Sequence, residues 1–156
     1  MKNDLSTSPL KLIGQINRTF ARVVDAPLRA EGFSIGQLPV LVTLKKHGAL
    51  SQADLARIAR VEQPSMAQLL NRMERDGLIF RIPDVHDRRS HLVSLAVDTV
   101  KRMPKGKAVM EAASRQALLG FSKEDQDLLT SLLERVNANL DHVAAGNDML
   151  TGATDC

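Results

Sequence analysis

The chain has 156 residues, of which 44% are hydrophobic and 25% charged, and its formal net charge is +3. These values are typical of a folded protein with one domain, or of one compact module with flanking helices. No apolar run approaches the roughly 20 residues of a membrane span. Residues 1–10 lack the basic and apolar regions of a signal peptide. We therefore expect a cytoplasmic protein without a membrane partner.

The composition also restricts the polyanions that the chain could bind. It has no Trp or Tyr and only four Phe, whereas proteins that bind single strands stack bases on aromatic side chains. Residues 57–91 contain seven arginines and five acids, and residues 122–148 contain two bases and six acids. An arginine-rich middle segment favours duplex DNA. The one cysteine, Cys156, excludes an internal disulfide.

The first predicted helix covers 9–30 and ends before Gly32. Pro27 should kink this helix or end its regular part, because proline removes a backbone donor. Four apolar residues at helical spacing form its predicted inward stripe: Leu12, Ile16, Phe20 and Val23.

The second predicted helix begins with a capping box formed by Ser34 and Gln37. Pro39 would then lie in the second turn, where it should disturb the helix. Gly48 should end this helix. Ser51 provides the same capping chemistry for a third helix, at 51–61.

The next segments predict a helix, two strands and a polar loop in chain order. The helix covers 64–77, with proline at its start and glycine at its end. Apolar alternation predicts strands at 78–82 and 91–97, joined by the loop 83–90. Together with 51–61, this order is that of a winged helix-turn-helix.

Two longer helices should close the chain. The fifth covers roughly 98–119, interrupted by Pro104 and Gly106, and the sixth roughly 123–145. Residues 146–156 are small and polar, and we expect a disordered tail there.

We therefore expect a mainly α fold with a small β-hairpin. Residues 34–97 would form the winged helix-turn-helix, and residues 1–33 and 98–145 would form dimerisation helices. These helices carry more apolar surface than a small core can cover, and a second copy of the chain is the simplest partner. The alternative is that they pack only within one chain.

The fourth helix has one apolar face and one polar face. Its predicted inward residues are Met66, Leu69, Leu70 and Met73. Amide, hydroxyl and guanidinium groups on the outward face could read the major groove, where the first helical turn goes deepest. A solvated surface helix is the alternative. The predicted DNA-binding residues of this helix are Gln63, Pro64, Ser65, Gln68, Asn71, Arg72 and Arg75.

Two arginines, Arg88 and Arg89, lie at or near the tip of the predicted hairpin. Guanidinium groups suit the narrow, negative minor groove of A·T-rich DNA. Asp87 beside them would repel phosphate unless it is paired, so we expect it to hold an arginine such as Arg72 or Arg88. A merely solvated charged loop is the alternative.

Other site chemistries have little support in the sequence. His86 and His91 could join Asp84 or Asp87 in a metal site, but no cysteine or further histidine is near in sequence. No catalytic triad order or glycine-rich phosphate loop is present. We expect no enzyme activity, no metal and no cofactor.

These segments resemble the MarR family of bacterial transcription regulators and, within it, the SlyA group. The resemblance covers about residues 9–145, and its motifs are 34–44 (SIGQLPVLVTL), 62–79 (EQPSMAQLLNRMERDGLI) and 87–89 (DRR). It implies a homodimer that binds pseudo-palindromic promoter DNA. It also implies that small phenolic or carboxylate effectors often relieve this binding. It also implies that Arg89 enters the minor groove, while Ser65 and Gln68 face the major groove.

The chain departs from the family pattern at three positions. Gln68 stands where the family often has arginine, so the family's preference for particular bases does not carry over to this chain. Ala96 stands where the family has a capping threonine, so Asp98 could begin the fifth helix instead. Cys156 does not match the family's peroxide-sensing cysteine.

The resulting hypothesis is a dimeric repressor or anti-silencer that binds operator DNA and responds to a small aromatic or carboxylate effector. The pocket residues for this effector are not predicted. The alternatives are an architectural DNA-binding protein without an effector and a winged-helix module that binds another protein.

Overall fold

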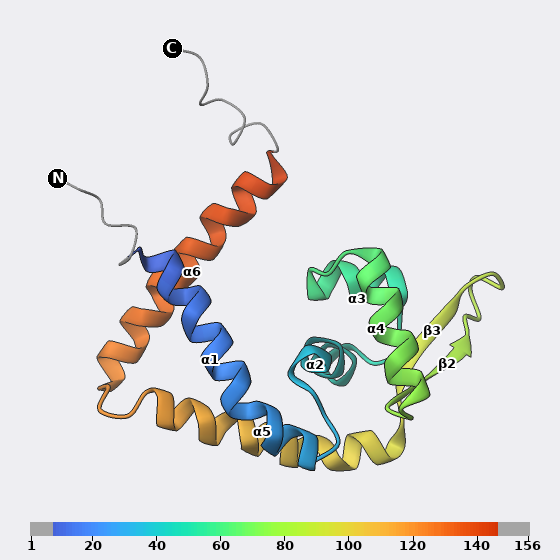
Figure 1. Ribbon diagram of the computed structural model, residues 1–156. Coiled ribbons are helices and arrows are strands. Elements are labelled where there is room, and N and C mark those ends of the chain that lie inside the picture. The colour runs from blue at the N-terminus through green and yellow to red at the C-terminus, as the bar shows by residue number, and fades with distance from the viewer. Residues whose placement is uncertain (1–7, 147–156) are drawn as a thin grey trace. The chain divides into compact units, whose positions relative to one another are not determined.

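The computed structural model describes residues 8–146, and the expectations for Cys156 and for the tail beyond Gly146 lie outside the described residues. The first of two units ends at Ala113, and the second begins at Ser114. None of the helices in the described part is long and apolar enough to cross a membrane. The elements in chain order are α1 (Pro9–Ala30), a 3-10 turn η2 (Ile35–Gln37), α2 (Leu38–His47), β1 (Leu50–Ser51), α3 (Gln52–Ala59), α4 (Gln63–Arg75), β2 (Ile79–Pro83), β3 (His91–Leu95), α5 (Val97–Ala117) and α6 (Lys123–Ala145) (Figure 1).

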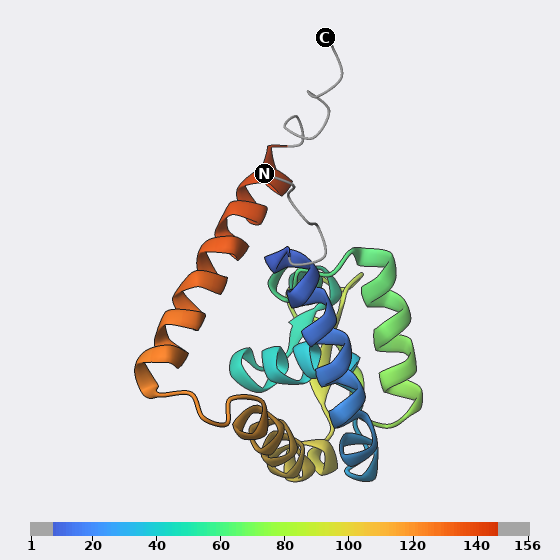
Figure 2. The ribbon, with the colours of Figure 1, turned by 60° about the vertical axis from the view of Figure 1, so that its left-hand side comes forward.

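The expected mainly α fold with a small β-hairpin is confirmed. Helices α2, α3 and α4 gather beside an antiparallel sheet with the strand order β1-β3-β2 (Figures 1 and 2). In the β2–β3 hairpin, Ile79 pairs with Leu95 and Pro83 pairs with His91. The hairpin is the wing of the winged helix.

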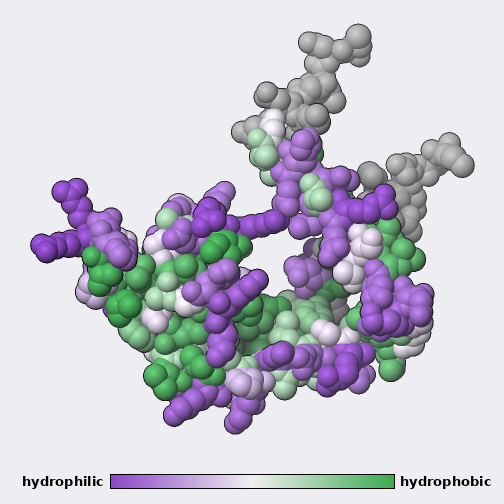
Figure 3. Space-filling model, turned by 180° about the vertical axis from the view of Figure 1, so that it is seen from behind, coloured by the Kyte–Doolittle hydropathy of each residue, from purple (hydrophilic) through white to green (hydrophobic). Residues whose placement is uncertain are grey.

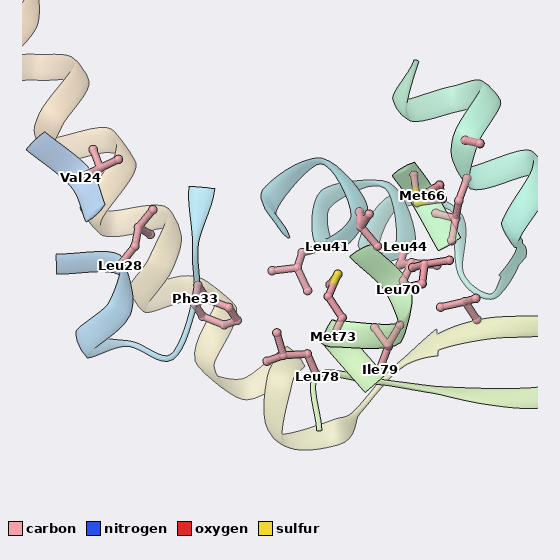
Figure 4. Packing of buried hydrophobic residues seen from close by; sticks show 14 residues of the cluster. Val24, Leu28, Phe33, Leu41, Leu44, Met66, Leu70, Met73, Leu78 and Ile79 are labelled. Carbon is pink, nitrogen blue, oxygen red and sulfur yellow. The ribbon is translucent and has the colours of Figure 1, made fainter. Parts of the chain in front are cut away.

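A small core joins these elements. Met66, Leu70 and Met73 of α4 are fully buried, and they meet Leu41 and Leu44 of α2 (Figure 4). Leu69 was also predicted to point inward, but it is only half-buried. Burying three side chains of this size stabilises the domain by about 1.5–3 kcal/mol each. This packing fixes which face of α4 remains exposed.

The inward face of α1 differs from the predicted stripe. Val24 and Leu28 are buried, whereas Leu12, Ile16 and Val23 are 46%, 64% and 58% exposed. The helix carries apolar residues on more than one side, and periodicity alone does not decide which side meets the core of the same chain. The exposed stripe remains as apolar surface.

Proline is tolerated at both helix positions where the sequence predicted disturbance. Pro27 lies inside α1, which continues to Ala30, so the helix does not end there. Pro39 falls in the first turn of α2, because the capping box of Ser34 closes the separate turn η2 before it. A first-turn proline loses no intrahelical hydrogen bond.

The start of α5 also corrects the predicted boundaries. Strand β3 ends at Leu95 rather than at residue 97, and α5 begins at Val97 rather than at Asp98. Pro104 and Gly106 do not interrupt α5, which is continuous.

In the second unit, Ser122 begins α6 with the predicted capping box. Its hydroxyl accepts the Asp125 backbone N–H at 3.0 Å, and the Asp125 carboxylate accepts the Ser122 N–H at 3.0 Å. None of the residues of α6 is buried. Five of its leucines are more than a third exposed: Leu128, Leu129, Leu132, Leu133 and Leu140.

Candidate nucleic-acid interface

The turn between α3 and α4 is built by local backbone chemistry. Ser51 caps α3 by accepting the Asp54 N–H at 3.1 Å. Arg60 ends α3 in the left-handed conformation, with φ of 55°. The carbonyl of Glu62 accepts the Met66 N–H at 2.9 Å, which begins α4. Two short helices therefore meet at a tight turn, as in a helix-turn-helix.

The seven residues predicted to bind DNA all lie on the exposed part of α4. The three buried residues of the helix are on the opposite face, packed on the core. Polar groups that can pair with base edges or phosphates are thus brought together on one solvent-facing surface. These exposed residues are Gln63, Pro64, Ser65, Gln68, Asn71, Arg72 and Arg75.

Arg88 and Arg89 are both exposed in the loop between β2 and β3. Figure 3 shows hydrophilic surface at the end of the hairpin. Hydrogen bonds within the loop shape its backbone. The Asp87 carboxylate accepts the Arg89 N–H at 3.0 Å, and the Asp87 carbonyl accepts the Ser90 N–H at 3.0 Å. The Asp84 carboxylate accepts the His86 N–H at 2.9 Å.

Asp87 therefore has a structural contact, but not the expected one. It holds the backbone of Arg89, and within residues 8–146 it forms no ion pair with Arg72 or Arg88. An aspartate that accepts the N–H two residues later forms an Asx-turn, which orders the loop without a guanidinium partner.

Arg81 on β2 was not among the site residues predicted from the sequence. Its Nη2 donates to the side-chain oxygen of Asn71 at 3.0 Å, and its Nη1 forms an ion pair with Glu74. Glu74 and Asn71 are seven and ten residues before Arg81 in the chain. Their proximity depends on the turn at Gly77, where φ is 74°.

The pKa of Asp54, near the start of α3, is shifted by its surroundings. Its carboxylate accepts hydrogen bonds from the Arg57 guanidinium at 3.1 Å and from the Ser51 hydroxyl at 2.9 Å. These bonds, the one from Arg57 first, lower the pKa of Asp54 below its ordinary value of 3.8.

Two hydrogen bonds also connect the segment that follows α4 with the start of α5. The carbonyl of Leu78 accepts the Ala96 N–H at 3.0 Å and the Thr99 hydroxyl at 2.9 Å. Thr99 is fully buried. Together these bonds join the segment that follows the helix-turn-helix to the first turn of α5.

A cavity of about 1030 Å³ lies between α2 and α5 in the first unit. This volume is at the upper end of the range of small-molecule sites, roughly 300–1,000 Å³. Its lining is apolar except for three lysines. The lining residues are Phe33, Ile35, Leu38, Pro39, Leu41, Val42, Lys45, Lys46, Val100, Met103, Pro104, Gly106, Lys107 and Met110.

Arg102 and Gly106 fix one wall of this cavity. The Arg102 guanidinium lies 5.2 Å from the centroid of the Phe33 ring and donates to the carbonyl of Glu31 at 3.0 Å. A Cβ at Gly106 would be 3.1 Å from the Phe33 ring. The ring is therefore held between a cation and a helix backbone.

No three His, Cys, Asp or Glu side chains within residues 8–146 lie close enough together to hold a metal ion. His86 and His91, which were considered as possible metal ligands from the sequence, are both exposed on the wing.

Comparison with known proteins relates this geometry to one family. A model of the MarR family matches residues 31–90, which contain α2, α3, α4 and most of the wing. The transcriptional activatory protein BadR of Rhodopseudomonas palustris is 32% identical over 148 residues, with 90% of this chain and 80% of BadR covered.

Solved structures have the same fold. The MepR–DNA complex of Staphylococcus aureus superposes with a TM-score of 0.78 at 21% identity, covering 85% of this chain and 98% of MepR. The PcaV regulator of Streptomyces coelicolor, in complex with its natural ligand, superposes with a TM-score of 0.77 at 20% identity, covering 86% of this chain and 95% of PcaV.

Proposed function

Since this chain belongs to the MarR family of transcriptional regulators, which are DNA-binding proteins and not enzymes, we propose that it is a homodimeric, sequence-specific regulator of the SlyA type. It binds a pseudo-palindromic operator as a repressor or anti-silencer. Residues 34–97 are its DNA-binding part, and residues 1–33 and 98–145 are its dimerisation helices. It acts in the cytoplasm.

One observation carries this proposal: the exposed polar face of α4 lies in the same small domain as the arginine-tipped wing. Ser65 and Gln68, in the first turns of α4, read base edges in the major groove. Arg89 enters the adjacent minor groove, and Arg88 meets phosphate. Asn71, Arg72 and Arg75, further along the helix, contact the DNA backbone.

Apolar surface that the single chain leaves exposed supports the proposed homodimer. Ile16 on α1 is 64% exposed, and Leu128 on α6 is 60% exposed. A second copy would cover such surfaces and provide a second reader for the other half of a palindromic site. Operator symmetry would then reflect the two-fold symmetry of the protein.

The effector is a small aromatic carboxylate, and its site is the cavity between α2 and α5. Apolar walls suit a ring, and the ammonium groups of Lys45, Lys46 and Lys107 suit a carboxylate. Lys107 also pairs with Glu111 at 3.6 Å, so Lys45 and Lys46 are the better variants for a test.

The decisive experiment is selection of bound duplexes from a random DNA pool by the full-length protein, with and without benzoate. We expect recovery of one palindromic motif and a change in its affinity when benzoate is present. Recovery of no preferred sequence would contradict sequence-specific regulation and favour a winged-helix module that binds protein.

Calorimetry with benzoate separates an effector-responsive regulator from an architectural DNA-binding protein. We expect binding that weakens when Lys45 and Lys46 are both replaced by glutamine, while Lys123→Gln on α6 leaves it unchanged. A preferred DNA motif combined with no heat at millimolar benzoate would favour the architectural alternative.

A further inference from the structure

Arg81 on β2 holds two side chains of α4 at the same time. Its Nη2 donates to the Asn71 side-chain oxygen at 3.0 Å, and its Nη1 pairs with the Glu74 carboxylate. Asn71 and Glu74 are three residues apart, so they are neighbours on the helix surface. We call these three side chains, Arg81, Asn71 and Glu74, the Arg81 clasp.

The clasp uses a property that distinguishes arginine from lysine. A planar guanidinium has several donors in a fixed fork, so it can satisfy two acceptors in one defined orientation. The side chains of Arg81 and Glu74 are 26% and 41% exposed. Ion pairs with this exposure contribute little to stability. The main consequence of the clasp is therefore orientation.

This orientation matters because α4 and the wing carry different parts of the DNA interface. Arg81 lies on β2, which leads directly to the loop with Arg88 and Arg89. Asn71 and Glu74 lie in the second half of α4, about one to two and a half turns after Ser65 and Gln68. Recognition groups work only when their supports hold them within about 0.5 Å and 10–20° of the productive geometry.

We propose that Arg81 is a positioning residue for DNA recognition, which fixes α4 against the wing through the clasp and does not itself contact DNA. The proposal rests on the proposed function. Both terminal nitrogens of Arg81 face acceptors of the protein, and Glu74 compensates its charge. Little of that charge remains for phosphate.

The clasp also restricts how Asn71 contributes. Pairing with adenine uses the carbonyl oxygen and the amino group of one amide together. The Asn71 carbonyl already accepts from Arg81, so its amino group is the part that it offers to DNA. A donor of this kind suits a phosphate oxygen better than bidentate reading of adenine.

The direction in which Glu74→Ala changes the DNA affinity distinguishes the clasp from a direct phosphate contact. If Arg81 were a direct phosphate ligand, Glu74→Ala would free its charge and strengthen DNA binding. Arg81→Leu would then lower the slope of log K against log salt concentration by about 1. In a clasp, both substitutions weaken binding, and the salt slope is unchanged because no phosphate contact is lost.

The experiment measures the affinity of the full-length protein for the duplex recovered by selection from a random pool, using fluorescence anisotropy at several salt concentrations. We expect Arg81→Leu and Glu74→Ala each to weaken binding by about tenfold, within the range of directly coupled residues. The double variant should be no weaker than Arg81→Leu. Additive losses, or tighter binding by Glu74→Ala, would overturn the proposal.

Two further variants keep the test sharp. Arg81→Lys retains the charge but not the fork, so we expect binding well below that of the wild type, whereas wild-type affinity would indicate a simple charge contact and overturn the clasp. Asp25→Asn with Arg29→Gln removes an exposed pair on α1, joined at 3.1 Å, and should leave binding unchanged. Circular dichroism and thermal unfolding check that every variant is folded.

The two proposals fail in different ways. A wild-type protein that selects no preferred duplex contradicts the proposed function, and the clasp with it. A wild-type protein that selects a motif, with clasp variants that bind it as tightly, contradicts only the positioning role of Arg81.

Discussion

The hydroxyl of Thr99 donates a 2.9 Å hydrogen bond to the carbonyl of Leu78, and Thr99 is fully buried. Leu78 follows the glycine turn after α4, and Thr99 lies in the first turn of α5. The contact therefore connects the segment that follows α4 with α5, the helix that lines the cavity. Ala96 donates to the same carbonyl at 3.0 Å, so two donors share one acceptor.

The first prediction concerns this contact. Thr99→Val keeps the shape of the side chain and removes the hydroxyl. Because Ala96 still satisfies the Leu78 carbonyl, the free energy of unfolding should fall by about 0.5–1.5 kcal/mol, rather than by the larger cost of an unsatisfied buried group. Denaturation by urea measures this loss. Thr99→Ser, which keeps the hydroxyl, is the control for the hydrogen bond. An unchanged free energy of unfolding in Thr99→Val would contradict a contribution of this hydrogen bond to stability.

The second prediction concerns the wing. Replacing Arg88 and Arg89 by alanine should weaken binding to the selected duplex and lower the slope of log K against log salt concentration by about 1 to 2, because cationic contacts with DNA release counterions. Anisotropy titrations at several salt concentrations measure both effects. Arg29→Ala, which removes an exposed arginine of α1, is the control. Unchanged binding by the wing variant would show that the arginines of the hairpin do not contribute to the DNA interface.

The fold was largely predictable because the chain marks its element ends by local chemistry. Ser34, Ser51 and Ser122 precede the turns and helices that they begin, and Gly48 ends α2. Strand β1 was not predicted, since Leu50–Ser51 has only two residues and overlaps the cap of α3. Its strand character comes from pairing with β3, which is a tertiary contact.

The candidate site was predictable only where one element supplies it. The outward residues of α4 follow from helical spacing in a single segment. The Arg81 clasp needed the register between a helix and a strand, and the lysines of the cavity lie on α2 and α5, about 60 positions apart in sequence. Such juxtapositions come from packing, and no local pattern in the chain signals them.

The third prediction concerns Asp54 and pH. Its folded-state pKa is lowered, chiefly by the hydrogen bond from Arg57, then by that from Ser51. A lowered pKa stabilises the fold above the unfolded-state pKa and loses this contribution as the pH falls through the folded-state value. Asp54→Asn should therefore be less stable than the wild type near neutral pH, and the gap should narrow below pH 3.8. Urea denaturation across this pH range measures the difference in the free energy of unfolding between the two proteins. A difference that grows as the pH falls would contradict the lowered pKa of Asp54.

The fourth prediction concerns Gly106, which is buried in α5 against Phe33. Alanine in a helix interior is favoured over glycine by about 1 kcal/mol, but its Cβ would lie 3.1 Å from the ring. The two effects oppose each other, so Gly106→Ala should change the free energy of unfolding little. Gly106→Val is larger, and overpacking should cost about 1–3 kcal/mol. Thermal unfolding ranks the three proteins, and calorimetry with benzoate reports whether a displaced ring closes the cavity.

The last prediction concerns assembly. Leu132 and Leu140 are 43% and 52% exposed on α6, where none of the residues is buried. If a second copy covers this face, Leu132→Lys places a charge in an apolar interface and should convert the dimer to a monomer. Analytical ultracentrifugation measures the mass, and circular dichroism checks that helix content is retained. A monomer presents one reader, so its affinity for a two-half-site duplex should fall towards that for a single half-site. Asn137→Lys, on the same helix, adds the same single charge at an exposed polar position and serves as the control. A Leu132→Lys protein that remains dimeric would show that the two copies meet through another surface.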